Sequence, residues 1–280
     1  MIKIKRGKSI RPILFVVRRR YVGVGRKYLL LYRTIIYFHT KHLKLKIMKN
    51  KFYTPMLSGL ILLFSLTLSC KRDKTPTPVA LSTPSTPVSD FEGNVYQTVK
   101  IGNQIWTTGN LRSTKFNDGS SIPYVDVQAN FVNLNTPAFA YYGFNFVNKP
   151  DYGPLYNYYA ATDPKIAPAG WHVPTEAEWQ TLILALGANA GDKLKEMGTT
   201  HWQPPVSNAT NESGLTVLPG GFIDGGDGSF NQLFYLATFW TSTETNAISA
   251  KAVQLINVNS TVSIGSPYKS NGYSLRLVKD

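Results

Sequence analysis

The residues best suited to chemistry lie in the stretch GWHVPTEAEW, residues 170–179. His172, Glu176 and Glu178 fall within seven positions, and imidazole and carboxylate groups are the ones that bind metals or transfer protons. The same letters also describe the start of a helix, because Thr175 is a preferred N-cap residue and Glu178 completes a capping box three positions later. We therefore predict that both glutamates serve the helix and that His172, on the extended segment before it, binds no metal.

One helix, over about residues 175–186, is predicted with a complete set of signals. Trp179, Leu182, Ile183 and Leu186 follow at i, i+3, i+4 and i+7, which places them on one apolar face. Gly187 then ends the helix, because glycine is favoured just after a helical C-terminus.

Short runs typical of β-strands make up most of the remaining pattern. NVYQTVKI and IWTTGNL are joined by GNQ, which predicts a hairpin with Gly102 and Asn103 at its turn and with Val95, Val99 and Ile101 on one face. Further strands are predicted at LTVLPGGF, ATFWTST, AKAVQLINV, TVSIG and GYSLRLVKD. We expect an α+β fold of mainly short antiparallel strands, long loops and one clear helix.

Charge is unevenly distributed along the 280 residues, whose formal net charge is +14. Residues 1–74 hold 19 of the 30 basic residues and one of the 16 acidic residues. Residues 75–280 hold the remaining 11 basic and 15 acidic residues, a net charge of −4. A nucleic-acid-binding surface would need positive charge on the folded part, so we exclude nucleic acid as a partner.

The N-terminal segment has the pattern of an export signal. Residues 1–47 contain no Asp or Glu, and we interpret them as an upstream extension before a true start at Met48; the alternative is a long basic region of the signal itself. Two lysines and then an apolar stretch over residues 55–69 follow Met48, and this stretch is too short for a spanning helix but suits a secretory signal, residues 48–69. Cys70, the only cysteine, comes next and resembles the lipidated cysteine of a bacterial lipoprotein.

We predict lipidation at Cys70, with a plain signal peptide or a single membrane anchor as the alternatives. A lipidated Cys70 leaves no thiol in the mature chain, which excludes disulfides, thiolate nucleophiles and cysteine-ligated metals. TPTPVALSTPSTPVS, residues 75–89, predicts an extended tether over residues 70–89 that holds a folded domain, residues 90–280, away from the membrane. The expected location is the cell envelope, at the outer membrane, on a side that the sequence leaves open.

Seven ordered stretches of this domain resemble the Fibrobacter succinogenes major paralogous domain family. They span roughly residues 92–280 and read TVKIGNQIWTTGNL, GPLYNYYAATD, GWHVPTEAEW, KLKEMGTTHWQPP, NATNESGLTVLPGG, FWTSTE and SLRLVKD. The resemblance implies a secreted or lipid-anchored protein. HVPTEAEW is also similar to a stretch of the formylglycine-generating family, which implies a C-type-lectin-like fold with a C-terminal strand returning to pair with the first.

These resemblances carry further implications for individual positions. The domain lacks the cysteine pair with which formylglycine-generating enzymes bind copper, and the nearest match to the WND motif of calcium-dependent lectins is Trp240-Thr241-Ser242. Many members of the first family carry cysteines where this chain has Ala167 and Leu277. The resemblance therefore implies that these two residues face each other in the fold.

Candidate ligand-binding residues are aromatic or acidic side chains in loop-rich stretches. The aromatic segment FAYYGFNFVNKPDYGPLYNYYAA either stacks on sugar rings or packs in the core. Asp224 and Asp227 in FIDGGDGSF either make turns or bind Ca²⁺, and we expect no other cofactor. We predict ligand contacts at Tyr142, Tyr152, Trp202, Asp224, Asp227, Trp240 and Glu244.

The function predicted from these features is binding without catalysis. The ligand is a polysaccharide, another glycan or another surface protein, and the membrane is contacted through the N-terminal lipid. A first alternative is a hydrolase in which His201 and Glu212 act as a pair, although no Gly-x-Ser-x-Gly motif supplies a nucleophile. A second alternative is a purely structural module of the envelope.

Overall fold

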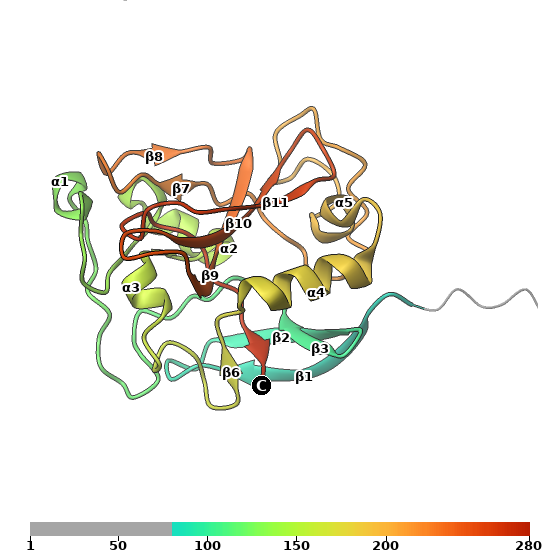
Figure 1. Cartoon of the computed structure of the whole chain (residues 1–280), viewed down its shortest axis with the longest axis horizontal. Coiled ribbons are helices and arrows are strands. Elements are labelled where there is room, and N and C mark those ends of the chain that lie inside the picture. Colours follow the sequence, from blue (N-terminus) through green and yellow to red (C-terminus); the bar gives the residue numbers. More distant parts are fainter. Residues whose placement is uncertain (1–79) are drawn as a thin grey trace, which may run out of the picture. The chain divides into compact units, whose positions relative to one another are not determined.

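The long helix α4 lies between two antiparallel sheets in the computed structural model, which describes residues 80–280 (Figure 1). A five-stranded sheet has the order β1 (Thr83–Ser89), β2 (Val95–Ile101), β3 (Gln104–Thr107), β12 (Val278–Lys279) and β6 (Trp171–His172). A three-stranded sheet has the order β11 (Val262–Gly265), β10 (Ala250–Ile256) and β9 (Leu236–Glu244). The predictions for residues 1–79, including lipidation of Cys70, lie outside the described residues.

Two small hairpins and several short helices complete the fold. β4 (Phe139–Ala140) pairs with β5 (Leu155–Tyr156), and β7 (Phe222–Ile223) pairs with β8 (Phe230–Asn231). The helices other than α4 (Glu176–Leu186) are short: α1 (Gln128–Phe131), α2 (Lys149–Tyr152), α3 (Tyr158–Ala161), α5 (Ala190–Leu194) and the 3-10 turns η1 (Tyr142–Phe144) and η2 (Phe146–Asn148). The α+β fold with one clear helix is therefore confirmed.

Helix α4 begins and ends where the sequence predicts. The Thr175 side chain accepts a hydrogen bond from the backbone N–H of Glu178, and the Glu178 side chain accepts one from the N–H of Thr175, so the capping box is complete. Gly187 follows the last turn with a φ of 68°, a left-handed value that glycine adopts without strain. Trp179, Leu182 and Leu186 are buried.

The N-terminal hairpin is confirmed, with one correction to its faces. β2 and β3 pair antiparallel around a turn at Gly102 and Asn103. Val99 and Ile101 are buried as predicted, but Val95 is exposed, while Tyr96 at the next position is buried. Tyr96 packs in a different hydrophobic cluster from Val99 and Ile101, so the two ends of β2 bury opposite faces and alternation alone does not assign one inward face.

Two predictions about chain ends need correction. The segment over residues 83–89, expected to be part of a solvated tether, forms strand β1 and pairs along β2. Its prolines are compatible with this position because β1 lies at the edge of the sheet, where a missing N–H costs no ladder bond. The terminal strand β12 pairs with β3 and β6 rather than with the first strand of the hairpin.

A hydrophobic cluster around α4 joins the two sheets. Trp179 contacts Trp106 of β3 and Phe239 of β9, with ring centroids 4.9 and 5.6 Å away. Val253 and Leu255 of β10 belong to the same cluster and are fully buried. The apolar face that the sequence assigns to α4 is thus covered by both sheets, which stabilises the helix by tertiary packing.

A buried arginine fixes the last segment against the remainder of the domain. The Arg276 guanidinium donates to Oδ1 of Asn110 and to the backbone carbonyls of Thr107, Leu215 and Thr216, at 2.8 to 3.3 Å. Burial lowers the pKa of Arg276 to about 9. Each bond reaches a segment distant in the sequence, so Arg276 acts as a junction of the fold.

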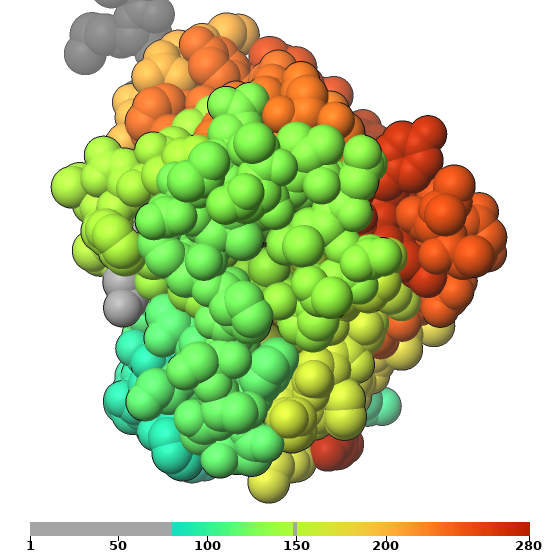
Figure 2. All heavy atoms as spheres, turned by 90° about the vertical axis from the view of Figure 1, so that its left-hand side faces the viewer, coloured from blue at the N-terminus to red at the C-terminus, as the bar shows by residue number. Residues whose placement is uncertain are grey.

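The long connection between β3 and α4 covers one face of the domain. Figure 2 shows this segment in green and yellow-green, bordered by orange and red atoms from the last third of the chain.

Ala167 and Leu277 are both buried in the second large hydrophobic cluster of the domain, but their mutual contact stays a prediction. Among residues 80–280, none of the helices is long and apolar enough to cross a membrane.

Candidate functional site

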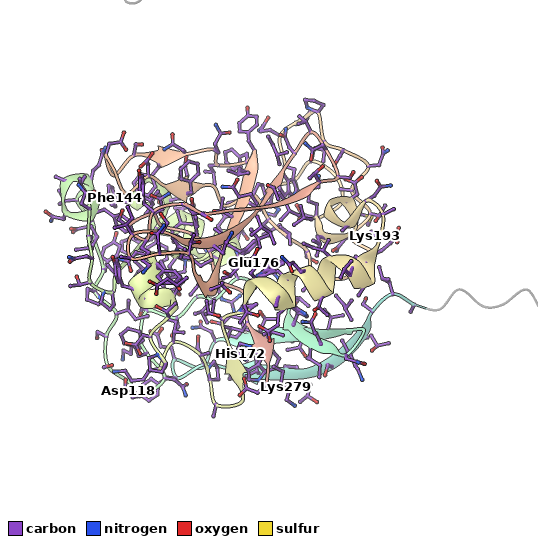
Figure 3. The ribbon with its side chains drawn as sticks, viewed as in Figure 1. Asp118, Phe144, His172, Glu176, Lys193 and Lys279 are labelled. Carbon is purple, nitrogen blue, oxygen red and sulfur yellow. The ribbon has the colours of Figure 1, made fainter. Side chains whose placement is uncertain are left out.

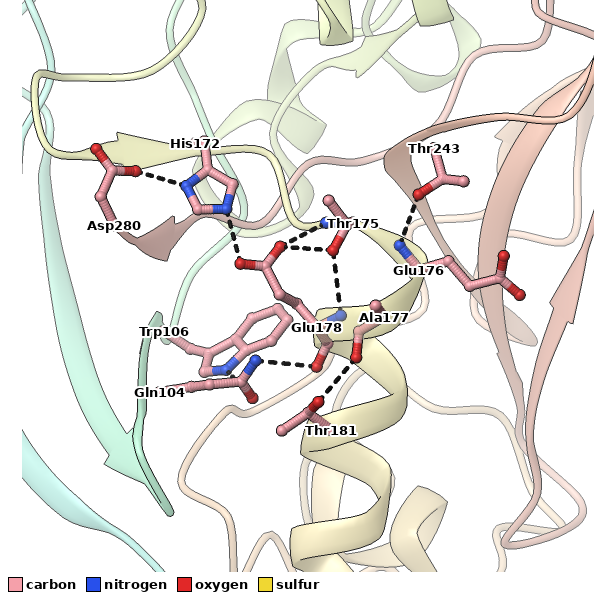
Figure 4. Close-up of polar contacts among 10 residues, drawn as sticks. All are labelled: Gln104, Trp106, His172, Thr175, Glu176, Ala177, Glu178, Thr181, Thr243 and Asp280. Atoms are coloured by element: carbon pink, nitrogen blue, oxygen red, sulfur yellow. Dashed lines mark hydrogen bonds and ion pairs between the residues drawn. The ribbon is translucent and has the colours of Figure 1, made fainter.

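The histidine of GWHVPTEAEW joins the start of α4 to the edge of the five-stranded sheet. Figure 3 shows His172 beside Lys279 of β12 and well apart from Phe144. His172 Nε2 lies 2.8 Å from Oε1 of Glu178, and its Nδ1 lies 2.6 Å from Oδ1 of Asp280 (Figure 4). The second oxygen of Glu178 accepts from the backbone N–H and the hydroxyl of Thr175 at 2.7 and 2.9 Å.

This arrangement gives both ring nitrogens of His172 hydrogen-bond partners within the protein. Partial burial acts to lower the pKa of His172, but the hydrogen bonds to Asp280 and Glu178 outweigh burial and raise the pKa. Both ring nitrogens of His172 are therefore bonded to carboxylates of the protein, which leaves neither of them directed toward a ligand. Glu176 points elsewhere, and its backbone N–H donates to the hydroxyl of Thr243. The cluster serves the start of the helix.

The proposed hydrolase pair is not formed. His201 Nδ1 lies 2.8 and 2.9 Å from the two oxygens of Glu196, and its Nε2 lies 4.0 Å from Oδ2 of Asp151. Glu212 instead faces Lys193, with 4.0 Å between the charged atoms. Spacing along a loop could not reveal that Glu196, five residues before His201, would become its partner.

Three of the predicted ligand-binding aromatics are buried. Trp202 and Trp240 have no exposed surface, and their indole N–H groups donate to the carbonyls of Val217 and Tyr156. Tyr152 is 4% exposed, and burial raises its pKa to about 12. These three side chains stabilise the core, and none of them reaches a ligand at the surface. Tyr142 is half-buried and lines a shallow hollow with Gln232, Leu233 and Tyr235.

The predicted acidic ligand residues have partners as well. Oδ1 of Asp224 accepts from the N–H of Gly226, and Oδ1 of Asp227 accepts from the N–H of Ser229, so both make turns. Glu244 forms an ion pair with Lys269, at 2.8 Å. Within residues 80–280, three or more His, Cys, Asp or Glu side chains nowhere gather closely enough to hold a metal ion.

A cleft next to the Asp224–Asp227 turn offers a different set of groups. Its volume is about 390 Å³, and it is lined by Asn133, Leu134, Asn135, Tyr159, Gly226, Ile248, Tyr268 and Ser270. Tyr268 and Ile248 are 59% and 63% exposed, so large apolar surfaces stand at its rim. These residues come from the two groups of segments that border each other in Figure 2. We call this feature the asparagine–tyrosine cleft.

Backbone hydrogen bonds hold the walls of the asparagine–tyrosine cleft in place. The N–H of Asn133 donates to the carbonyl of Gly225 at 2.7 Å. The N–H of Lys269 donates to Ile248 at 2.9 Å, and the carbonyl of Lys269 accepts from Tyr158 at 3.0 Å. The first bond joins the segment of Asn133 to that of Gly226, and the other two join the segments of Ile248 and Tyr159 to the segment that contains Tyr268 and Ser270. The cleft is therefore largely formed before any ligand arrives.

Glycine is required at one point of this construction. A Cβ atom on Gly225 would come within 2.2 Å of the Ser270 hydroxyl and 2.5 Å of its backbone carbon. The N–H of Gly225 also donates to Oδ1 of Asn271 at 2.9 Å. The two loops that form the floor of the cleft can therefore approach each other only because residue 225 has no side chain.

The polar side chains of the asparagine–tyrosine cleft retain their hydrogen-bonding capacity. In the part of the chain that the structure describes, the side-chain amides of Asn133 and Asn135 and the hydroxyls of Tyr159, Tyr268 and Ser270 form no hydrogen bond with other protein groups. The aromatic stretch that contains Tyr159 was singled out from sequence, but the other four lining side chains were not. Their positions, far apart in the chain, carry no local signal.

Comparison with known proteins identifies one family. The family model described as Fibrobacter succinogenes major domain matches residues 99–279. The match begins within β2, ends in β12 and includes every residue that lines the asparagine–tyrosine cleft. Neither a curated protein nor a solved structure matches the chain.

Proposed function

The chain belongs to the Fibrobacter succinogenes major domain family, and from that premise we propose that it is a lipid-anchored protein of the cell envelope that binds a glycan in the asparagine–tyrosine cleft. The anchor is the lipidated Cys70, which follows the apolar stretch over residues 55–69. The C-type-lectin-like fold is part of the same proposal. The membrane is the outer membrane, and the domain acts by binding rather than by catalysis.

One observation carries the proposal: the exposed ring of Tyr268, the half-buried ring of Tyr159 and unpaired amide and hydroxyl groups line a single preformed cleft. A sugar ring has an apolar face of C–H groups and an edge of hydroxyls. Tyrosine rings stack on the face and bury it at a low cost in side-chain entropy. Asparagine amides both donate and accept, which matches the hydroxyls at the edge. Tyr268 and the pair Asn133 and Asn135 provide both kinds of contact.

The experiment is glycan-array binding by the detergent-solubilised full-length protein, followed by calorimetry with any soluble glycan that binds. Tyr268→Ala should weaken binding by about tenfold, since exposed aromatic anchors carry a large share of binding energy. Tyr235→Ala is the matched control, because Tyr235 is a similarly exposed tyrosine that lines the other hollow. Equal losses in both variants would contradict the assignment of the cleft.

Two further arms separate the alternatives. Binding that survives EDTA supports a calcium-independent cleft, whereas loss in EDTA that Asp224→Asn reproduces would place Ca²⁺ at the Asp224–Asp227 turn. Hydrolysis of a bound glycan that His201→Ala abolishes would favour an enzyme. A protein that binds no glycan and hydrolyses none would be a structural module.

A further inference from the structure

We propose that the asparagine–tyrosine cleft selects an uncharged glycan over an anionic one, an inference that rests on the proposed function. All eight lining residues are uncharged. Three charged residues nevertheless lie within one or two positions of lining residues in the sequence: Lys269, Asp227 and Asp224. What the fold does with each of them determines the electrostatic character of the cleft.

Lys269 is turned away from the cleft. It stands between Tyr268 and Ser270, which both line the cleft, yet its own side chain is 8% exposed. Its ammonium group lies 2.8 Å from Oε1 of Glu244 and 5.3 Å from the centre of the Tyr158 ring. The ammonium group of Lys269 is therefore paired with a carboxylate and lies against an aromatic ring. It is not available to pair with an anionic ligand.

The two aspartates leave negative charge near the cleft. Asp224 and Asp227 flank the turn that contributes Gly226 to the lining, and Asp227 is exposed. Hydrogen bonds from the hydroxyl and the N–H of Ser229 lower the pKa of Asp227, so its carboxylate stays ionised at neutral pH. A carboxylate within a Debye length of a bound anion repels that anion. A uronate or sulfate group would meet this repulsion without a compensating cation.

Neutral hydroxyls suit the polar groups that remain. The amides of Asn133 and Asn135 and the hydroxyl of Ser270 present donors and acceptors together, and none carries a charge. Burying an ionised group against such partners carries a desolvation cost that no ion pair compensates. The cleft thus favours an uncharged sugar by two independent effects, the lack of a cation and the nearby negative charge.

The test compares neutral and anionic polysaccharides on the full-length protein in detergent. The probes are mannan, galactan, xylan and a mixed-linkage glucan on one side, and polygalacturonate and alginate on the other. We expect at least one neutral polymer to bind about tenfold or more tightly than either polyuronate, with a Tyr268-dependent affinity that changes less than about twofold between about 50 and about 300 mM NaCl. Equal or tighter binding of a polyuronate would overturn the inference.

A charge-gain variant sharpens the test. Ile248→Lys places a cation at the exposed rim and should create or strengthen polygalacturonate binding by about fivefold or more at low salt. Val258→Lys is the matched control, because Val258 is also exposed but does not line the cleft. Polyuronate binding unchanged by Ile248→Lys would contradict the inference.

The outcomes distinguish this inference from the proposed function. Polyuronate binding that depends on Tyr268 in the unaltered protein would keep the glycan-binding cleft and refute its selectivity. Absence of Tyr268-dependent binding to any of the six polymers would overturn both.

Discussion

Two polar regions of this domain contain residues of the kind found in functional sites, and they differ in how those residues are used. At the start of α4, His172 and Glu178 have their side-chain polar atoms bonded to protein partners. In the asparagine–tyrosine cleft, Asn133, Asn135 and Tyr268 have side chains without such partners in the described chain. Residue type alone favoured the first region as a chemical site. Because the polar atoms of the first region are already bonded within the protein, the second region is the better candidate for binding a ligand.

The difference follows from the free energy of desolvation. A buried or half-buried polar group must find a protein partner, and once it has one it gains little from a ligand. Groups at the rim of an open cleft remain bonded to water, which a ligand can replace. Substitutions at the start of α4 should therefore change stability and leave binding intact, whereas substitutions in the cleft should do the reverse.

The largest effect is expected at the core side of α4. Trp179→Ala removes a side chain that is 1% exposed and contacts both sheets, so we expect the free energy of unfolding to fall by about 3–5 kcal/mol in urea denaturation. Trp179→Phe keeps most of the packing and should cost less, in part because the buried indole N–H has no hydrogen-bond partner in the described chain. Equal costs for the two variants would contradict this account of the cluster.

A smaller and opposite effect is expected from a cross-link near the segment that precedes α4. Ala167→Cys combined with Leu277→Cys should form a disulfide and raise the free energy of unfolding by about 2–4 kcal/mol, less the cost of removing the buried leucine. Thiol titration before and after reduction measures the bridge. Two free thiols under oxidising conditions would show that the residues do not face each other and would refute the pairing implied by the family resemblance.

The N-cap should contribute about 1 kcal/mol. Thr175→Ala removes the hydroxyl that accepts from the N–H of Glu178, which leaves a helix N–H unpaired. Thr181→Ala is the control, because Thr181 is an exposed threonine within the same helix whose hydroxyl donates to the carbonyl of Ala177. Denaturation curves should show a clear loss for the first variant only. Under conditions in which both variants are fully folded, their affinities for glycan should be the same.

The smallest effect, below about 1 kcal/mol, should be the pH dependence contributed by His172, since its side chain is partly exposed. Its pKa is raised in the folded state, so its stabilisation is fully present below the unfolded value of about 6.5 and is lost as pH rises through the folded value. The stability advantage over His172→Gln should therefore shrink as pH rises from the unfolded value through the raised folded pKa. An advantage that grows with pH would contradict the sign of this argument.

The sequence determined the local features of the domain. Thr175, Glu178 and Gly187 specify both ends of α4 because a capping box and a glycine C-cap act within a few residues. Gly102 and Asn103 specify the first hairpin for the same reason. The inward face of β2 could not be assigned in this way, because the two ends of the strand bury opposite faces against different hydrophobic clusters.

Only the tertiary structure decided where binding groups lie. Trp202 and Trp240 resemble ligand anchors in the sequence, but packing buries them completely. The asparagine–tyrosine cleft is assembled from positions as distant as Asn133 and Tyr268, and its floor closes because Gly225 packs directly against Ser270. No local pattern encodes such contacts, since each depends on segments that meet only after the two sheets have packed around α4.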